Sequence, residues 1–316
     1  MSDIENYPWL NKLFLNINVS KLPHSSLIEG SKGMGKSILA KNLAKSLLCI
    51  NSSNSPCNNC QSCNLFDEST HPDFFMNDDD EKILIDEIRE MINFSVLSSS
   101  VSPTKVIVLN NCENMNTASQ NAILKTLEEP NPNTFIIMSS SKRRSLNQTI
   151  YSRCNKIVLK DLNQLEITEW VRSQGMQDFN YYDYPTFLAP LEILKNIEEG
   201  RGNDYIDISN CLLQFCNNEI SINETVKYLL DVNLGSLEKV NLLIDFFKTL
   251  LKSNLADIPY SGKFKLLNDI QFQPIDLSNT LNELNLLRDN IMKVSAINES
   301  HSLKYFIFKL DALIKQ

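Results

Sequence analysis

The chain has 316 residues, 42% of them apolar, and its 30 Lys and Arg against 38 Asp and Glu give a net charge of −8. This composition supports a packed core and two or three domains, and it excludes a largely disordered chain. It also excludes a protein that grips nucleic acid through a broad basic surface, and no apolar run approaches the ~18–20 residues of a membrane span.

Short apolar runs alternate with helical periodicity over the first 160 residues. The runs that predict buried strands are Ser26–Ile28, Asp73–Met76, Lys105–Leu109, Phe135–Met138 and Lys156–Leu159, and helical spacing is clear at Ile38–Leu48 and Ala118–Leu127. Strands that alternate with helices favour an α/β fold with a doubly wound, mostly parallel sheet.

The rest of the chain predicts helices. We therefore expect three domains: an α/β domain over residues 1–160, a small helical domain over 161–202 and an all-helical domain over 203–316. The last domain is leucine-rich, as in Val240–Leu251 and Leu281–Met292, and we expect Pro259 and Pro274 in turns.

A phosphate-binding loop lies between the first predicted strand and the first predicted helix. The segment from Gly30 to Ser37 matches G-x-x-x-x-G-K-[ST] at every fixed position. Glycines let backbone N–H groups turn toward an anion, while the Lys can reach the β and γ phosphates and the Ser can ligate Mg²⁺. We therefore expect ATP with Mg²⁺ as the ligand, held by Gly30, Gly33, Gly35, Lys36 and Ser37. A loop that binds a nucleotide without hydrolysing it is an alternative.

The strand that should carry catalytic carboxylates ends in amides. An ATPase of this kind needs an Asp for the Mg²⁺ shell, often followed by a Glu that activates the attacking water. Here Lys105–Leu109 is followed by Asn110 and Asn111, and an amide cannot take up a proton at neutral pH. We therefore expect ATP hydrolysis by this chain to be slow or absent.

Other acidic residues are weaker candidates for the missing carboxylates. Glu113 follows three residues later, and we expect it to point elsewhere. An alternative places the acidic strand end at Asp86-Glu87, but apolar residues follow at helical spacing, so Asp86 is expected at the start of a helix.

Four of the eight cysteines, Cys49, Cys57, Cys60 and Cys63, form a C-x7-C-x2-C-x2-C cluster. Four thiolates this close can surround one tetrahedral Zn²⁺, and such a closed site is structural. An iron–sulfur cluster is an alternative, but the ferredoxin run places its fourth Cys downstream, before a Pro. Four unligated thiols in a reducing cytosol are a third interpretation. His71 is a rival ligand, although a polar residue at a turn before a strand fits it better.

Arg153 lies in a Ser152-Arg153-Cys154 turn before the last predicted strand. A single arginine is usually a surface residue, but a guanidinium can also stabilise charge on a transferring phosphoryl group, in the same chain or across an interface. The other cysteines are expected in the core: Cys112, Cys154, Cys211 and Cys216.

The order of these motifs resembles a known family. After the phosphate loop and the four-Cys insert come Thr70-His71-Pro72-Asp73, Asp86-Glu87-Ile88-Arg89, Asn121–Pro130 and the Ser-Arg-Cys turn. Together they resemble the bacterial clamp-loader subunits of DNA polymerase III, members of the AAA+ ATPases. The resemblance covers residues 7–160 strongly and the rest only in general architecture. It implies an AAA+ sheet with a zinc insert at residues 49–63, a small helical lid and a helical collar.

Within this family the chain resembles the delta-prime subunit more than the tau/gamma ATPases, which keep the Asp-Glu pair. The resemblance implies a stator in a hetero-pentameric ring with tau/gamma and delta subunits, which loads the sliding clamp onto primer–template DNA. It implies a cytoplasmic subunit of the polymerase III holoenzyme, a nucleotidyltransferase complex, with weak or absent ATPase activity of its own.

The resemblance also assigns roles to residues. Arg153 matches the arginine finger that is offered to the nucleotide on a neighbouring subunit, and the four cysteines match the zinc ligands. AAA+ ATPases place a sensing arginine early in a lid helix, and none occurs near Ala189–Glu192. The alternatives are a tau/gamma-like ATPase and an unrelated zinc-bearing nucleotide switch.

Overall fold

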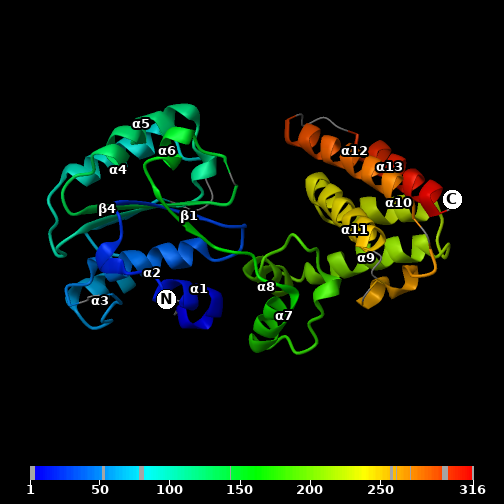
Figure 1. Ribbon diagram of the computed structural model, residues 1–316, viewed down its shortest axis with the longest axis horizontal. Helices are drawn as coiled ribbons and strands as arrows, with labels where there is room; N and C mark the ends of the chain where they lie inside the picture. Colours follow the sequence, from blue (N-terminus) through cyan, green and yellow to red (C-terminus); the bar gives the residue numbers. More distant parts are fainter. Residues whose placement is uncertain are drawn as a thin grey trace. The chain divides into compact units, whose positions relative to one another are not determined.

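The computed structural model describes residues 4–51, 54–77, 82–142, 144–256, 259–260, 262–270, 272–293 and 298–314. The chain splits into two compact units, residues 1–162 (the N-terminal unit) and residues 163–316 (the C-terminal unit). Figure 1 shows the strands in the first and helices in the second. The expected division into three domains, 1–160, 161–202 and 203–316, stays a prediction.

The N-terminal unit alternates strands with helices. In chain order its longer elements are α1 (Pro8–Leu15), β1 (Ser25–Glu29), α2 (Lys36–Leu48), α3 (Gln61–Asp67), β2 (Phe74–Met76), α4 (Ile85–Val96), β3 (Lys105–Leu109), α5 (Thr117–Glu128), β4 (Thr134–Ser140), α6 (Gln148–Tyr151) and β5 (Asn155–Val158). Short 3-10 turns lie at Ile4–Asn6, Val19–Lys21 and Cys112–Asn114. The β3 strand spans the predicted residues, and the other strands differ from prediction by one or two residues at one or both ends.

The five strands pair in parallel in the order β2-β3-β4-β1-β5. Strand β1 is internal, with Leu27 in register with Met138 of β4 and Lys156 of β5. The expected doubly wound, parallel sheet is confirmed. Because the strands are parallel, the segments after β1, β3 and β4 meet at one edge of the sheet, where ligands of such sheets bind.

Helices cover both faces of this sheet. Helices α4, α5 and α6 lie over one face, and α1 and α2 lie on the other (Figure 1). Successive side chains of a strand point to opposite faces of the sheet, so each strand contributes apolar residues to the core on both faces. Leu27, Ile107 and Met138 join a fully buried cluster with Ile88 of α4 and Ile123 of α5. Burial on both faces explains why the strands are continuous apolar runs.

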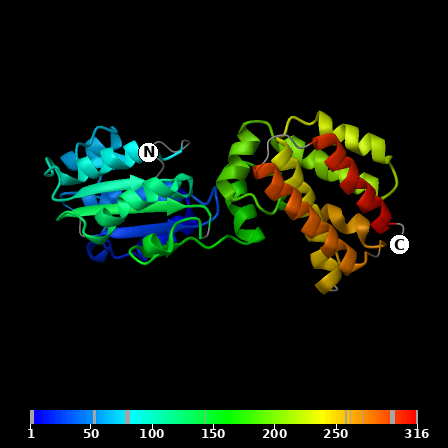
Figure 2. The same cartoon turned by 90° about the horizontal axis from the view of Figure 1, so that it is seen from above.

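The C-terminal unit contains helices and no strands among its described residues (Figures 1 and 2). They are α7 (Gln164–Ser173), α8 (Pro190–Glu198), α9 (Gly202–Cys216), α10 (Ile222–Asp231), α11 (Ser236–Ala256), α12 (Pro274–Lys293) and α13 (Glu299–Ile314), with 3-10 turns at Tyr181–Asp183 and Gly262–Leu267. In the described part of the chain, no helix combines the length and the apolar character that crossing a membrane requires.

Helix starts in this unit follow local sequence rules. Asn163 with Glu166, and Ser221 with Glu224, form capping boxes at α7 and α10. The expectation of a turn at Pro274 is wrong, because this residue begins α12. Proline is tolerated at the first helical position, where its missing N–H has no intrahelical partner to lose.

Candidate functional site

The phosphate-binding loop, residues 30–37, connects β1 to α2. Gly33 and Gly35 have φ angles of 76° and 88°, a region that strains any residue with a Cβ. Gly35 is the N-cap of α2, so the first N–H groups and the positive end of that helix face the loop. The loop therefore has the backbone geometry of an anion site.

Side-chain contacts hold this loop in place. The Lys36 Nζ donates to the carbonyl oxygens of Gly30 and Ser31, both at 3.0 Å, and Lys36 is only 6% exposed. A Cβ on Gly30 would lie 2.8 Å from the Cβ of Leu159, so only glycine lets the chain after β5 approach this closely. Ser37 is half-buried in the first turn of α2. The expected nucleotide-binding residues thus lie in one loop, and their role stays a prediction.

Asn110, directly after β3, is buried and hydrogen-bonded. Its backbone N–H donates to the amide oxygen of Asn77 at 2.7 Å, and its own amide oxygen accepts from the hydroxyl of Ser139 at 3.1 Å. Its Nδ2 has no hydrogen-bond partner in the described structure. The oxygen that could ligate Mg²⁺ is already engaged, and carboxylates are the usual protein ligands of this ion. The end of β3 therefore offers an amide where a magnesium-binding carboxylate is expected.

The other acidic candidates lie where the sequence placed them. Both carboxylate oxygens of Glu113 accept the backbone N–H of Ser141 at 3.1 Å, so this side chain is directed at the end of β4. Asp86 and Glu87 occupy the first turn of α4, which confirms the helix-start interpretation. The acidic run at 78–81 lies outside the described residues.

Arg153 lies between α6 and β5, and its side chain is 29% exposed. The Nη1 donates to the carbonyl oxygen of Thr149 at 3.1 Å, and the Nη2 donates to the carboxylate of Glu128 at 3.0 Å. The Nε is buried without a hydrogen-bond partner among the described residues. Sequence reasoning singled out Arg153 but missed Glu128, because two charged residues 25 positions apart leave no pairing signal.

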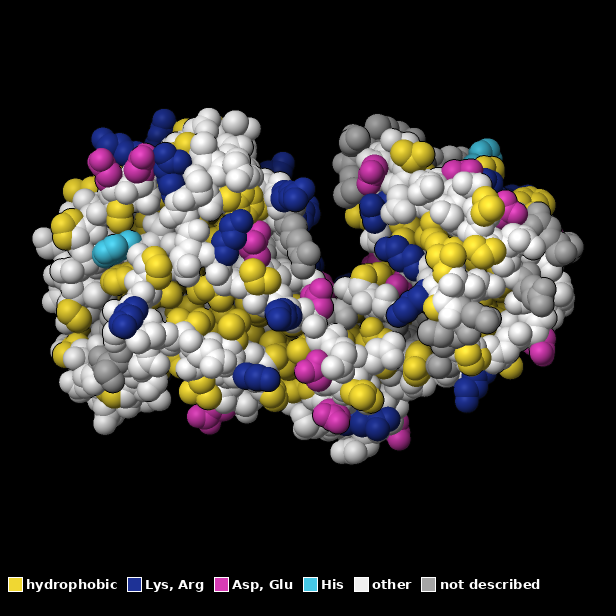
Figure 3. All heavy atoms as spheres, viewed as in Figure 1, with side chains coloured by type: hydrophobic (Ala, Val, Ile, Leu, Met, Phe, Trp, Pro, Cys, Tyr) yellow, Lys and Arg dark blue, Asp and Glu magenta, His cyan; other side chains and the backbone are white. Residues whose placement is uncertain are grey.

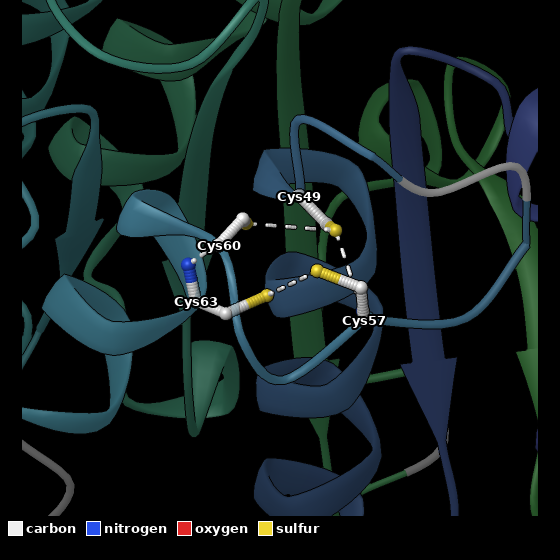
Figure 4. A group of neighbouring side chains, drawn as sticks. All are labelled: Cys49, Cys57, Cys60 and Cys63. Atoms are coloured by element: carbon white, nitrogen blue, oxygen red, sulfur yellow. Dashed lines mark hydrogen bonds between the residues drawn. The ribbon is translucent and has the colours of Figure 1, made fainter.

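The four clustered cysteines converge on one point (Figure 4). Cys49 caps the end of α2, Cys60 caps the start of α3, and Cys63 lies in the first turn of α3. All four sulfur atoms lie within 4.8 Å of one another, with 3.9 Å between Cys49 and Cys60 and 4.0 Å between Cys57 and Cys63. Zn–S bonds of ~2.3 Å in a tetrahedron place the sulfurs about 3.8 Å apart, so the residues fit a zinc ion.

Backbone groups favour thiolates in this cluster. The N–H of Cys63 donates to the sulfur of Cys60, and the N–H of Cys57 donates to the sulfur of Cys49, both at 3.4 Å. Burial tends to raise the pKa of Cys60, but backbone N–H groups and neighbouring thiols outweigh it and lower this pKa to about 6. Burial raises the pKa of Cys63 to about 12. A bound cation would favour the thiolate at all four positions.

His71 supports the cysteine cluster without being a ligand. Its Nδ1 accepts the backbone N–H of Asp73 at 3.0 Å, and its Nε2 lies 2.9 Å from the hydroxyl of Ser62 and 3.1 Å from that of Ser102. Both hydroxyls donate to the carbonyl oxygen of Leu48 at 2.7 Å. Burial lowers the pKa of His71, which favours the neutral ring. Ser62 and Leu48 neighbour two of the cysteines, so this network, which the sequence did not reveal, ties the cluster to the sheet.

The charged surface matches the acidic composition. On the face shown in Figure 3, Lys and Arg side chains are interspersed with Asp and Glu rather than gathered into one basic field. This face therefore does not present a broad basic surface.

Comparisons with known proteins agree with the motifs. Residues 7–163 match the family model described as "DNA polymerase III, delta subunit". The DNA polymerase III subunit delta' of Haemophilus influenzae is 31% identical over 207 residues, which cover 61% of this chain and 62% of the relative. The subunit delta' of Pseudomonas aeruginosa is 35% identical over 159 residues, 49% of this chain and 48% of the relative.

A subunit named gamma/tau also matches, at lower identity. The DNA polymerase III subunit gamma/tau of Mycoplasma genitalium is 25% identical over 285 residues, which cover 89% of this chain and 45% of the relative. In each case the chain spans less than two thirds of the relative's length. The resemblance to the delta' and gamma/tau clamp-loader subunits, expected from the sequence, is confirmed.

Proposed function

We propose that this chain, whose residues 7–163 match the family model described as "DNA polymerase III, delta subunit", is a delta-prime-like stator of a clamp loader. Its partners would be tau/gamma and delta subunits in a hetero-pentameric ring. Through that ring it would act on the sliding clamp and on primer–template DNA.

The buried amide of Asn110 carries this proposal. A subunit that hydrolyses ATP needs a carboxylate near the phosphate loop to orient water and share in the metal shell. In the described structure the end of β3 offers Asn110, whose oxygen is bound to Ser139, and Glu113 is committed to Ser141. The loop can cradle a triphosphate, but neither Asn110 nor Glu113 is placed to activate water there.

Arg153 would act on a nucleotide that a neighbouring subunit holds. Charge on the transferring phosphoryl group grows in the transition state, and a guanidinium supplied across an interface stabilises it. The 29% exposure of the Arg153 side chain leaves it accessible to such a neighbour. DNA engagement would bring Arg153 into the neighbour's site, and hydrolysis there would release the clamp onto DNA.

The cysteine cluster would hold one structural zinc ion. Cys49, Cys57, Cys60 and Cys63 would be its four ligands, which leaves no open position for a substrate. Zinc would fix the loop between α2 and α3, because that segment has few apolar residues of its own.

A tau/gamma-like ATPase is the second candidate. The complete phosphate loop, with Gly33 and Gly35 at positive φ and the buried Lys36, favours it. Steady-state ATP hydrolysis by the isolated chain, with Lys36→Ala as the control, separates the two functions. The stator hypothesis predicts equal, negligible rates, and the ATPase hypothesis predicts turnover that the substitution removes.

A further inference from the structure

We propose that Glu128 is a positioning residue for Arg153, which orients the guanidinium before it meets the neighbouring subunit's nucleotide. This inference rests on the proposed finger role of Arg153 and assigns a function to a second residue of the same site.

Two acceptors from different helices hold the two ends of the guanidinium. Glu128 is the last residue of α5 and accepts from Nη2, while the carbonyl of Thr149 in α6 accepts from Nη1. The Nε faces the protein interior and is buried. Three of the five N–H groups are therefore fixed by the chain or enclosed by it.

The remaining donors can serve a phosphate. A guanidinium has one N–H on Nε and two on each Nη, so one N–H remains on Nη1 and one on Nη2. Phosphate oxygens can accept from this pair without displacing Glu128 or the Thr149 carbonyl. Glu128 can thus hold Arg153 while Arg153 binds phosphate, and it does not compete with the phosphate for these donors.

Fixing the arginine in advance should raise the rate. An arginine side chain loses rotamer freedom when it binds phosphate, and contacts that hold it beforehand reduce that loss. An ion pair that is partly exposed contributes little to folding, and the Glu128 side chain is 58% exposed. Loss of Glu128 should therefore affect turnover at the neighbour's site more than it affects the stability of this chain.

The next residue is a matched control. Glu129 has the same charge, is exposed, and makes no side-chain hydrogen bond or ion pair in the part of the chain that the structure describes. A general effect of negative charge at the end of α5 would appear at Glu129 as well, whereas positioning of Arg153 would not.

The test is DNA-stimulated ATP hydrolysis by the clamp loader reconstituted with its partner subunits. We expect Glu128→Ala to lower kcat about 3–10-fold with the KM for ATP unchanged. Glu128→Gln, which keeps an acceptor oxygen, should retain at least half of the rate, and Glu129→Ala should stay within twofold. Arg153→Ala should cost more, and the double variant with Glu128→Ala should match Arg153→Ala alone. Thermal melting of each chain checks that it is folded.

Three results would overturn the inference. Wild-type or faster turnover by Glu128→Ala, with Arg153→Ala impaired, would refute positioning and leave the finger intact. A further loss in the double variant would mean that Glu128 acts independently of Arg153. Unchanged turnover in Arg153→Ala would refute the finger itself and, with it, any role of Glu128 in holding it.

Discussion

The hydroxyl of Ser139 donates a hydrogen bond to the amide oxygen of Asn110 across 3.1 Å, which joins the ends of the neighbouring strands β4 and β3. This contact engages the Asn110 atom that could ligate a metal. The phosphate loop matches its motif at every fixed position, whereas the end of β3 lacks the carboxylate that should act with it.

Nucleotide binding should depend on the loop alone. We predict that the isolated chain binds ATP and that Lys36→Ala weakens binding at least tenfold, because the Nζ is held over the loop by the carbonyls of Gly30 and Ser31. Equilibrium dialysis with labelled ATP measures this. Lys32→Ala, at a variable position of the same loop, should bind within threefold of wild type. Equal affinity in wild type and Lys36→Ala would show that the loop is not the site.

Within the assembled loader, substitutions at Arg153 and at Lys36 should affect ATP hydrolysis differently. We expect Arg153→Ala to lower DNA-stimulated ATPase activity at least tenfold without preventing assembly, since fingers of this kind stabilise transition-state charge. Lys36→Ala should leave most of that activity, because the turnover occurs on neighbouring subunits. A loader that loses its activity with Lys36→Ala but keeps it with Arg153→Ala would reverse these assignments.

The cysteine cluster should contain one zinc ion per chain. Elemental analysis of the purified protein should give a molar ratio near one, with no iron and no visible chromophore. Cys57→Ser or Cys60→Ser should lower the zinc content and the melting temperature, because the metal orders the α2–α3 loop. Cys112→Ala, in the core and outside the cluster, should keep its zinc. Iron, or protein without metal, would contradict this assignment.

The buried carboxylate of Asp73 should make stability depend on pH. Burial tends to raise its pKa, but the backbone N–H groups of Ser100, Val101 and Ser102, at 2.6–2.8 Å, lower it below the usual value. A lowered folded-state pKa stabilises the fold above about pH 4, where the unfolded group ionises, and this stability is lost as pH falls through the folded-state pKa.

Asp73→Asn tests that prediction. Replacing the ionised acceptor should cost about 2–4 kcal/mol of unfolding free energy at pH 7 and less at pH 3. Denaturant unfolding at the two pH values measures the difference. Asp86→Asn, at an exposed residue in the first turn of α4, should change stability little at either pH. A cost for Asp73→Asn that does not vary with pH would contradict the role of its charge.

Local patterns predicted the sheet and the motifs well. The β3 run of Lys105–Leu109 is buried on both faces, so its continuous apolar character gave both its type and its bounds. The residues of the phosphate loop, and likewise the four clustered cysteines, are close in sequence, so their spacing alone predicted that they would lie together. Pro274 shows the limit, because a proline fits a turn and a helix start equally well until the residues around it are placed.

Contacts between distant segments had no such signal. The Arg153–Glu128 pair depends on how α5 packs beside α6, and the His71 network joins Ser62 and Ser102, which lie 40 residues apart. Polar residues of these types are common on any surface, so only the fold reveals which of them meet. The supports of the candidate sites were therefore less predictable than the sites themselves.

Steady-state ATP hydrolysis by the purified chain alone, at saturating MgATP, tests most directly whether this protein cradles a nucleotide without splitting it. We predict a rate indistinguishable from that of Lys36→Ala. Rapid turnover that disappears in Lys36→Ala would contradict the proposal that this chain binds ATP without hydrolysing it.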